Sequence, residues 1–516
     1  MNVGNWIRKR SILSPNKTAI IFEDQKITYS EINERVNRLA NALLNRGIKK
    51  GDRVAALLYN CPQFLEVYFA LAKIGAIFVT LNFRLAPREL LYMIENSGTS
   101  FLIFDQAFSE GIDSIRPSLS IKENNFVCVG NDKPKWAQGY EEFLKQGSAF
   151  EPQVEEEIDL EHPQMIMYTS GTTGIPKGAL LPHRKTFYNT FNAVLYFDLT
   201  SKDVMLVVMP LFHSGGLNIA AVPTLYTGGT IVIQKSFDPK QTLSLIEKHK
   251  ITLAMLVPTM LNFMLKRANL DDYDLSSIRT LMVGGEPIPL TLIKAYMDRG
   301  IPIRQVFGQT ETSILLWLSE EDAIRKIGSV GKPVFHSEVR VVNKKGEDVA
   351  PKEVGEIIVK GPVQMLGYWN DPKQTAETIR DGWLHTGDLA TVDEEGFVYI
   401  VDREKDMYIS GGENVYPAEI ERVLGEHPKI LEVAVIGVPD EKWGEVGKAL
   451  IVPKTGEKLT KEEVLDFLKD KLAKYKIPKH VEFTTEFPKT ASGKIKKVEL
   501  RKKFGGKKVI ERVKNS

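Results

Sequence analysis

Hydroxyl groups, glycines and one lysine are concentrated in the stretch Tyr168-Thr169-Ser170-Gly171-Thr172-Thr173-Gly174-Ile175-Pro176-Lys177-Gly178. Glycines let a backbone approach a ligand closely, and successive backbone N–H groups in such a loop bind anions. The hydroxyls add donors, and Lys177 adds a positive charge suited to a phosphate. The stretch is not a Walker A loop, which has the pattern G-x-x-x-x-G-K-[ST]. We predict a phosphate-binding loop of another type, with an ordinary polar turn as the alternative.

Three further polar or glycine-rich segments each follow an apolar run that is typical of a buried strand. Pro210–Leu217 follows strand 204–209, Gly284–Pro287 follows strand 279–283, and Phe307–Thr312 follows strand 302–306. In open α/β sheets, ligands bind at the carboxyl ends of the strands. We therefore expect these segments to line one site with the phosphate loop.

Strand and helix patterns alternate through the first three hundred residues. Early examples are strand 54–58, a helix from Pro62, strand 76–81 and helix 87–96, and segment 134–154 is expected to be irregular. Alternation of this kind predicts layered α/β structure, here in two subdomains. From Val330 the pattern changes to short strands, at 338–342, 355–360 and 397–401, which predict a small β subdomain.

A dense charge cluster, Asp402–Asp406, marks the predicted boundary between an N-terminal domain, 1–402, and a C-terminal domain, 403–516. Beyond it, Pro417 begins a helix and 433–438 is an apolar strand. Thr460 and Glu463 form a capping box for a helix expected to reach Tyr475. The second domain is thus predicted to be small and α+β.

Composition excludes several classes of function. The chain has 516 residues and a formal net charge of +2, so its charge gives no reason to expect nucleic-acid binding. It has no apolar run of about 18 residues, as a membrane span requires, and no signal-peptide pattern. Cys61 and Cys128 lack metal-ligand spacing and are expected to be buried packing residues. Sparse cysteine favours a reducing compartment, and we expect a cytoplasmic protein.

The C-terminal residues from Lys494 onward are strongly basic. Two interpretations are left open. The basic side chains form a solvated face, or they bring the protein to an anionic membrane surface.

Three more motifs join those above: Gly382–Leu389, Ser410-Gly411-Gly412-Glu413-Asn414, and Pro488–Lys494. Together and in this order, the motifs resemble those of the adenylate-forming superfamily, which includes acyl-CoA synthetases, luciferases and the adenylation domains of peptide synthetases. The resemblance extends from about Pro15 to Arg501. The run 410–417 is most similar to fatty-acyl-CoA and related acyl-CoA synthetases.

The resemblance implies a reaction in two halves. A carboxylate attacks the α-phosphate of ATP to give an acyl-adenylate and pyrophosphate, and the thiol of coenzyme A then displaces AMP. ATP, Mg²⁺ and coenzyme A are the implied cofactor and co-substrates. The superfamily rotates its mobile C-terminal domain between the halves, and Lys405 matches the hinge position.

The resemblance also implies roles for particular residues. Lys494 bridges the substrate carboxylate and the α-phosphate, Thr310 contacts the α-phosphate, and Glu311 binds Mg²⁺, which needs few protein carboxylates. The residues implied to bind ATP or AMP are Thr169, Ser170, Gly171, Thr172, Thr173, Gly174, Lys177, Gly285, Glu286, Phe307, Gly308, Gln309, Thr310, Asp388, Arg403 and Lys494. Those implied to contact coenzyme A are Ser410, Gly411 and Gly412.

The acyl pocket is the part of the site that should select the substrate. By resemblance it is lined by His213, Ser214, Leu217, Asn218, Ala221, Val283, Gly284, Gly308 and Ile314. His213 is expected to position the reacting groups rather than to act as a general base. Because most of these residues are small or apolar, we predict an aliphatic acid of medium or long chain. Aryl acids of the benzoate or coumarate type are the alternative.

Two other functions and the oligomeric state are also left open. An adenylating enzyme that loads a carrier protein in trans would share these motifs. A nucleotide-binding protein without catalysis is disfavoured, because Lys494, Glu311 and Asp388 are all present. The implied partners are a small-molecule acid, ATP and coenzyme A, and a homodimer is left open.

Overall fold

The computed structural model describes residues 2–169, 176–285, 288–403, 406–410, 413–440, 443–469, 471–472, 474–490 and 493–505. Contacts within the chain divide it into two compact units. The first unit comprises Met1–Thr169, Pro176–Val339 and Val359–Leu384. The described residues of the second unit are 340–358 and those from 385 onward.

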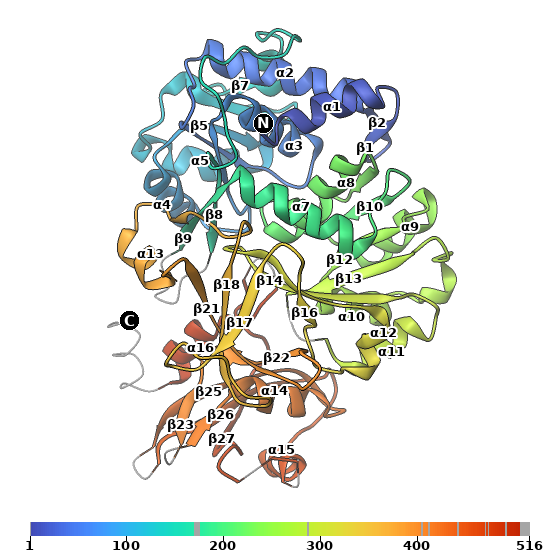
Figure 1. The fold of residues 1–516 in the computed structure, drawn as a ribbon, viewed down its shortest axis with the longest axis vertical. Coiled ribbons are helices and arrows are strands. Elements are labelled where there is room, and N and C mark those ends of the chain that lie inside the picture. Colours follow the sequence, from blue (N-terminus) through green and yellow to red (C-terminus); the bar gives the residue numbers. More distant parts are fainter. Residues whose placement is uncertain are drawn as a thin grey trace. The chain divides into compact units, whose positions relative to one another are not determined.

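An eight-stranded sheet in the first unit has the order β19-β9-β8-β4-β3-β5-β6-β7 (Figure 1). Its strands are β3 (Arg53–Leu57), β4 (Ile77–Thr80), β5 (Thr99–Asp105), β6 (Phe126–Val129), β7 (Gln138–Gly139), β8 (Pro163–Thr169), β9 (Lys177–Pro182) and β19 (Gly367–Tyr368). The strands from β7 to β8 are parallel, and β9 and β19 are antiparallel additions. The β8–β9 pair places Thr169 opposite Lys177, so the two ends of the predicted phosphate loop lie side by side.

The helices of this part begin where the sequence supplies caps. They are α1 (Asn5–Leu13), α2 (Tyr29–Asn45), α3 (Pro62–Ile74), α4 (Pro87–Ser97), α5 (Ser109–Ile115) and α6 (Tyr140–Leu144). Thr28 and Glu31 form a capping box at the start of α2. Helices α3 and α4 each have a proline in the first turn, where its missing N–H costs nothing.

A nine-stranded sheet, also in the first unit, has the order β16-β15-β14-β13-β12-β10-β11-β1-β2. Its strands are β1 (Thr18–Phe22), β2 (Gln25–Thr28), β10 (Val204–Val207), β11 (Thr230–Ile233), β12 (Leu253–Leu256), β13 (Thr280–Gly284), β14 (Ile303–Gln309), β15 (Ser313–Leu318) and β16 (Lys332–Pro333). The middle strands, from β1 to β14, are parallel. The carboxyl ends of β10, β13 and β14 therefore share one edge, as the motif positions predicted.

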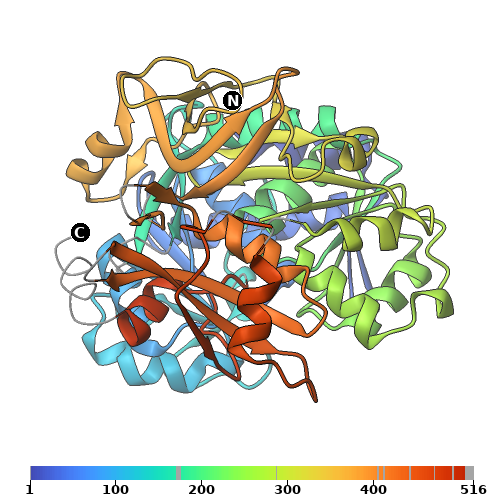
Figure 2. The same ribbon diagram turned by 90° about the horizontal axis from the view of Figure 1, so that it is seen from below.

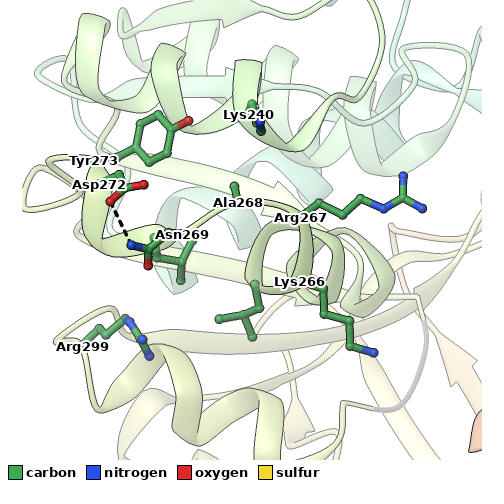
Figure 3. A pocket seen from close by; sticks show the side chains of 10 residues that line it. Lys240, Lys266, Arg267, Ala268, Asn269, Asp272, Tyr273 and Arg299 are labelled. Atoms are coloured by element: carbon green, nitrogen blue, oxygen red, sulfur yellow. Dashed lines mark hydrogen bonds between the residues drawn. The ribbon is translucent and has the colours of Figure 1, made fainter. Parts of the chain in front are cut away.

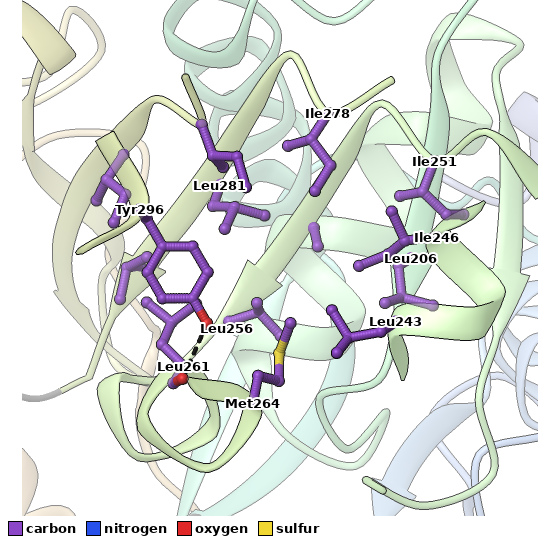
Figure 4. Close-up of a cluster of buried hydrophobic side chains, with 14 of the residues drawn as sticks. Leu206, Leu243, Ile246, Ile251, Leu256, Leu261, Met264, Ile278, Leu281 and Tyr296 are labelled. Carbon is purple, nitrogen blue, oxygen red and sulfur yellow. Dashed lines mark hydrogen bonds between the residues drawn. The ribbon is translucent and has the colours of Figure 1, made fainter. Parts of the chain in front are cut away.

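Helices α9 (Pro239–His249), α10 (Pro258–Arg267) and α11 (Leu290–Met297) pack on one face of this sheet. Their buried residues, such as Leu243, Leu261 and Tyr296, meet strand residues such as Leu206 and Leu281 (Figure 4). The buried Tyr296 hydroxyl donates to the Leu261 carbonyl at 2.9 Å, so its polar end is satisfied. Burying each such side chain stabilises the fold by about 1.5–3 kcal/mol.

The remaining helices of the first unit are α7 (His183–Phe197), the π-helix η4 (Gly215–Ala221), α8 (Val222–Thr227), α12 (Glu320–Arg325) and α13 (Pro372–Thr378). Helix η4 packs against α7, α8, β10, β12 and β15. It therefore lies beside both α7, the helix that follows the phosphate loop, and β15, the second strand of the β14–β15 hairpin.

The rest of the chain forms two smaller sheets. The first has the order β17-β18-β21-β20 with β22 beside β21. The boundaries between the two units fall within β17, β18 and β21. The second, with the order β24-β23-β26-β25 and β27 on β26, belongs to the second unit with helices α14, α15 and α16 (Figure 2, orange to red). The strands are β17 (Glu338–Val342), β18 (Gly355–Lys360), β20 (Ile379–Arg380), β21 (Trp383–Val392), β22 (Val398–Arg403), β23 (Tyr408–Ser410), β24 (Glu413–Val415), β25 (Ile430–Asp440), β26 (Gly444–Pro453) and β27 (His480–Phe483), and the helices are α14 (Pro417–Gly425), α15 (Lys461–Leu468) and α16 (Lys497–Phe504).

The structure confirms the predicted α/β class and departs from the prediction in two segments. Segment 134–154 is not wholly irregular, because it contains β7 and α6. Helix α15 has the predicted capping box but ends at Leu468, because the backbone leaves the helical region at Lys469. Both cysteines are buried and free, as expected.

The predicted boundary after residue 402 stays a prediction. Contacts group residues 340–358 and 385–402 with the C-terminal residues rather than with the first unit. In the part of the chain described above, no helix is long and apolar enough to cross a membrane.

Candidate active site

The end of β14 and the turn to β15 carry the predicted site residues from Gly308 to Glu311. The strand register shifts between Phe307 and Gly308. A Cβ at position 308 would lie 1.7 Å from the Ser313 carbonyl oxygen, and Ser313 itself has a φ of 61°. Only glycine tolerates so close an approach. The turn is therefore held in a conformation that this sequence requires.

Glu311 is buried in this turn, with 9% of its surface exposed. The Tyr368 hydroxyl donates to Glu311 Oε1 at 3.0 Å, and the Thr169 hydroxyl lies 3.5 Å from the same oxygen. The Met365 N–H donates to the Glu311 carbonyl oxygen at 2.8 Å. Two segments that are distant in the sequence, the end of β8 and residues 365–368, therefore hold Glu311, and a hydroxyl from each contacts its carboxylate. A carboxylate of this kind suits a hard cation such as Mg²⁺, which takes few protein ligands and completes its shell with phosphate oxygens and water.

Lys177 lies next to the same group of residues. Its ammonium donates to Gln374 Oε1 and lies 5.6 Å from the centre of the Tyr368 ring. Burial lowers the pKa of Lys177, while the acidic groups Asp371, Glu377 and Glu311 oppose that change. Burial also raises the pKa of Tyr368, and Glu311 adds to that shift, so the phenol stays protonated and donates. The predicted phosphate ligand and the predicted metal ligand thus share Tyr368 as a neighbour.

Lys185, near the start of α7, is a buried cation beside the turn and was not predicted. Its side chain is 1% exposed and its ammonium donates to the Ser313 hydroxyl. Burial lowers its pKa to about 7, although Glu311 acts to raise it. One turn further along α7, Asn189 accepts a hydrogen bond from the Ile314 N–H at 3.2 Å. Helix α7 therefore holds the first two residues of β15.

The predicted acyl-pocket residues gather around η4. Ser214, Leu217, Asn218 and Ala221 are buried, and Asn189 of α7 donates to the Asn218 carbonyl at 2.6 Å. Within the described residues, neither Ser214 Oγ nor Asn218 Oδ1 has a hydrogen-bond partner. Buried polar atoms without partners are uncommon in proteins. These two atoms therefore keep unused hydrogen-bonding capacity among the described residues.

His213 and two glycines complete this side of the site. His213 is half-buried, its N–H donates to the Pro210 carbonyl at 3.1 Å, and its own carbonyl accepts from the Leu217 N–H at 3.1 Å. A Cβ at Gly216 would lie 2.4 Å from the Pro210 carbonyl oxygen, and one at Gly284 would lie 2.4 Å from that of Val306. Backbone segments therefore pass each other closely at both glycines.

In the second unit, the structure brings Asp388 and Arg403 together. They lie opposite each other on the neighbouring strands β21 and β22. Asp388 is 3% exposed, and its N–H donates to the Thr386 hydroxyl at 3.1 Å. The turn before it is fixed by Glu356, which accepts from the Gly387 N–H at 2.9 Å. The backbone placement agrees with a shared role for the two residues.

Two other predicted residues of this unit lie in hairpins. Ser410 is buried and pairs with Glu413 in the β23–β24 hairpin. Lys494 is exposed at the end of a tight turn, where the Thr490 N–H donates to its carbonyl at 2.7 Å and its own N–H donates to the Thr490 hydroxyl at 3.1 Å. The predicted residues that lie outside the described part of the chain are Ser170, Gly171, Thr172, Thr173, Gly174, Glu286, Lys405, Gly411 and Gly412.

Sequence analysis missed Tyr368, Gln374 and Lys185. Tyr368 and Gln374 come more than fifty positions after Glu311 in the sequence, and no motif identifies them. Lys185 carries a signal, because Lys185, Asn189 and Asn192 recur at helical spacing on the buried face of α7. Polar residues at such positions indicate a polar network inside the fold.

An open hollow of about 550 Å³ lies elsewhere, at the end of α10 (Figure 3). Lys240, Arg267 and Arg299 are among its lining residues. Arg299 pairs with Asp271 at 3.1 Å, and Arg267 lies 4.5 Å from the centre of the Phe263 ring. None of the predicted site residues lines it, and we assign it no role in the reaction.

The buried Lys185 gives a test of stability against pH. The unfolded chain holds this proton up to about pH 10.5, whereas the folded protein releases it near pH 7. The burial of Lys185 therefore costs most below pH 7, and the cost falls as the pH rises toward 10.5. We expect Lys185→Met to raise the free energy of unfolding by about 1–4 kcal/mol at pH 6. The gain should shrink toward pH 10 in denaturant titrations.

Lys73→Met is the matched control. Lys73 is also buried, and burial lowers its pKa to about 8, but its ammonium pairs with Glu151 at 2.7 Å. Its removal leaves that carboxylate without its partner and should destabilise the protein. Equal destabilisation by both substitutions at pH 6 would show that Lys185 is as well paired as Lys73.

Known proteins resemble this chain over nearly all of its length. The family model of the AMP-binding enzymes matches residues 8–369, and that of the AMP-binding enzyme C-terminal domain matches residues 419–494. A feruloyl-CoA synthase from Amycolatopsis sp is 42% identical over 98% of this chain and 99% of its own.

Two solved structures share the fold. The O-succinylbenzoate coenzyme A synthetase of Bacillus subtilis in complex with ATP and magnesium ion has a TM-score of 0.86 and 34% identity, covering 96% of this chain and 99% of its own. A fatty acyl CoA synthetase from Mycobacterium tuberculosis has a TM-score of 0.78 and 34% identity, covering 98% of each chain. The chain therefore belongs to the AMP-binding enzyme family, the adenylate-forming superfamily that its motifs resemble, and is an AMP-forming acyl-CoA synthetase.

Proposed function

We propose that this enzyme is an ATP-dependent CoA ligase for an aromatic carboxylic acid. It would convert the acid to an acyl-adenylate and transfer the acyl group to coenzyme A. The observation that carries the proposal is the 42% identity, along the whole chain, to a protein named for feruloyl-CoA. This relative favours the aryl alternative over the aliphatic acid that the apolar pocket residues predicted.

The two unpaired polar atoms in the predicted acyl pocket also favour this substrate class. Leaving a buried polar group without a partner costs about 1–3 kcal/mol. An alkyl chain would leave Ser214 Oγ and Asn218 Oδ1 without partners, whereas a ring with a hydroxyl substituent could pair with them. A fatty acid remains the second candidate, because a fatty acyl CoA synthetase shares the fold.

The first unit supplies residues for the phosphate side of adenylation. Lys177 would bind the phosphates, and Glu311, held by Tyr368 and Thr169, would bind Mg²⁺. Mg²⁺ neutralises charge on the phosphates when it is bound. In the second unit, Asp388 and Arg403 would bind the ribose, and Lys494 would place its charge on the carboxylate and the α-phosphate. Free coenzyme A is the proposed acceptor, in keeping with the relatives' names.

A panel of acids tests the proposal directly. Thioester formation with ATP and coenzyme A should be fastest with hydroxylated aryl acids such as coumarate, slower with benzoate, and slowest with saturated acids from acetate to palmitate. Asn218→Leu should raise KM about tenfold for the hydroxylated acids, the size expected for loss of one hydrogen bond, and should leave benzoate nearly unchanged. Highest rates with palmitate or another saturated acid would contradict the aryl assignment.

The Tyr368–Glu311 hydrogen bond gives a second test. Tyr368→Phe removes a donor to a carboxylate, which is worth about 1.5–3 kcal/mol. We expect acyl-AMP formation to slow by about 10- to 100-fold, most severely at low Mg²⁺. Thioester formation from supplied acyl-AMP should change little.

Tyr296→Phe is the control, since it also removes a buried tyrosine hydroxyl bond but lies in the core of the nine-stranded sheet. It should lower stability without changing the Mg²⁺ dependence. If both substitutions had the same effect on acyl-AMP formation, Tyr368 would have no special link to the metal ligand.

A further inference from the structure

Two of the basic residues after Lys494, Lys497 and Arg501, are paired with acids of the same unit. Helix α16 begins three residues after Lys494 and carries much of the basic run. Lys497 pairs with Glu421 at 2.7 Å, and Arg501 pairs with Asp406. These partners come from α14 and from the residue after the predicted hinge position, Lys405. Lys497 and Arg501 are thus engaged inside the second unit, whereas Lys502 and Lys503 are exposed.

The Arg501–Asp406 pair is well shielded from solvent. The two side chains are 12% and 13% exposed. Exposed ion pairs contribute little to stability, whereas breaking a buried pair is strongly destabilising. This pair joins helix α16 to the chain that leaves the predicted hinge.

Lys497 lies in an acidic setting. Its partner Glu421 also accepts a hydrogen bond from the Val435 N–H at 2.6 Å, which links α14 to β25. Burial acts to lower the pKa of Lys497, but Glu421, Asp406 and Asp402 outweigh it and raise the pKa above the ordinary value. Lys497 is therefore charged at neutral pH, and its ion pair is intact there.

Lys494 lies three residues before the start of α16. Gly493 has a φ of 90°, which closes the tight turn. Lys496, two residues after Lys494, is the N-cap of α16. Leu500 of this helix is buried with Val438 and Phe487. The orientation of α16 therefore sets the position of Lys494.

We propose that Lys497 and Arg501 are positioning residues for adenylation: their ion pairs with Glu421 and Asp406 fix α16, and with it Lys494, to the segment that follows the predicted hinge. The inference rests on the proposed function only in taking Lys494 as the adenylating lysine. Lys494 would then move together with the second unit in any rotation at Lys405. A purely structural role would instead lower stability and slow both half-reactions alike.

Charge-swap variants of the full chain test the proposal. We expect Lys497→Glu and Glu421→Lys each to slow acyl-AMP formation by about 10- to 100-fold in single turnovers. Thioester formation from supplied acyl-AMP and coenzyme A should change by less than about threefold. The double variant, which restores the pair in reverse, should recover most of the adenylation rate. Arg501→Asp, Asp406→Arg and their double variant should follow the same pattern.

Two further variants guard against misfolding and against general charge effects. Lys497→Gln removes the cation without adding a carboxylate, and should show the adenylation defect at a temperature at which its melting curve shows it to be fully folded. Lys496→Glu changes the same charge two residues from Lys494, but its partner Glu499 lies on the solvent side, with 37% and 49% of the side chains exposed. It should leave both half-reactions nearly unchanged.

The outcomes separate this inference from the proposed function. Equal slowing of both halves, failure of both double variants to recover adenylation, or a normal rate for Lys497→Gln would overturn the inference alone. A wild-type enzyme that formed no acyl-AMP from any acid would overturn the proposed function and the inference together.

Discussion

The contact between the buried Glu311 carboxylate and two hydroxyl groups is the interaction on which the site depends. Moving a carboxylate out of water is costly unless donors or a cation replace the lost solvent. Tyr368 and Thr169 supply donors, and Lys185 places a positive charge behind the turn. Two segments that are distant from Glu311 in the sequence meet at one of its carboxylate oxygens, so the fold of the first unit determines the position of that oxygen. A carboxylate fixed in this way would need little reorganisation to bind the Mg²⁺ ion proposed above.

Much of this arrangement could be predicted from the sequence, because backbone geometry restricts which residue types can occupy certain positions. Gly308 was identified within a strand-end motif, and the structure shows why no other residue fits beside Ser313. The order of strands and helices, and the convergence of strand ends at one edge, follow from local periodicity and parallel pairing. The pairing of Asp388 with Arg403 across β21 and β22 also agrees with the roles implied by the family motifs.

Side chains that come from other parts of the fold could not be predicted in the same way. Tyr368 lies 57 positions after Glu311 and contacts it only because β19 adds to the edge of the eight-stranded sheet. The basic run after Lys494 illustrates a related limit. A count of charges describes it as a cationic surface, whereas Lys497 and Arg501 have acidic partners far away in the sequence. Sequence analysis placed Ser214 and Asn218 in the acyl pocket, but only the structure shows that, among the described residues, Ser214 Oγ and Asn218 Oδ1 have no hydrogen-bond partner.

We propose above that Lys494, in the second unit, serves adenylation and takes no part in thioester formation. Single-turnover assays on Lys494→Ala test it, with ATP plus acid for one half and supplied acyl-AMP plus coenzyme A for the other. Adenylation should slow by about 10²–10³-fold, the scale for loss of one transition-state donor, while thioester formation stays nearly intact. Slowing of both half-reactions by the same factor would contradict the claim.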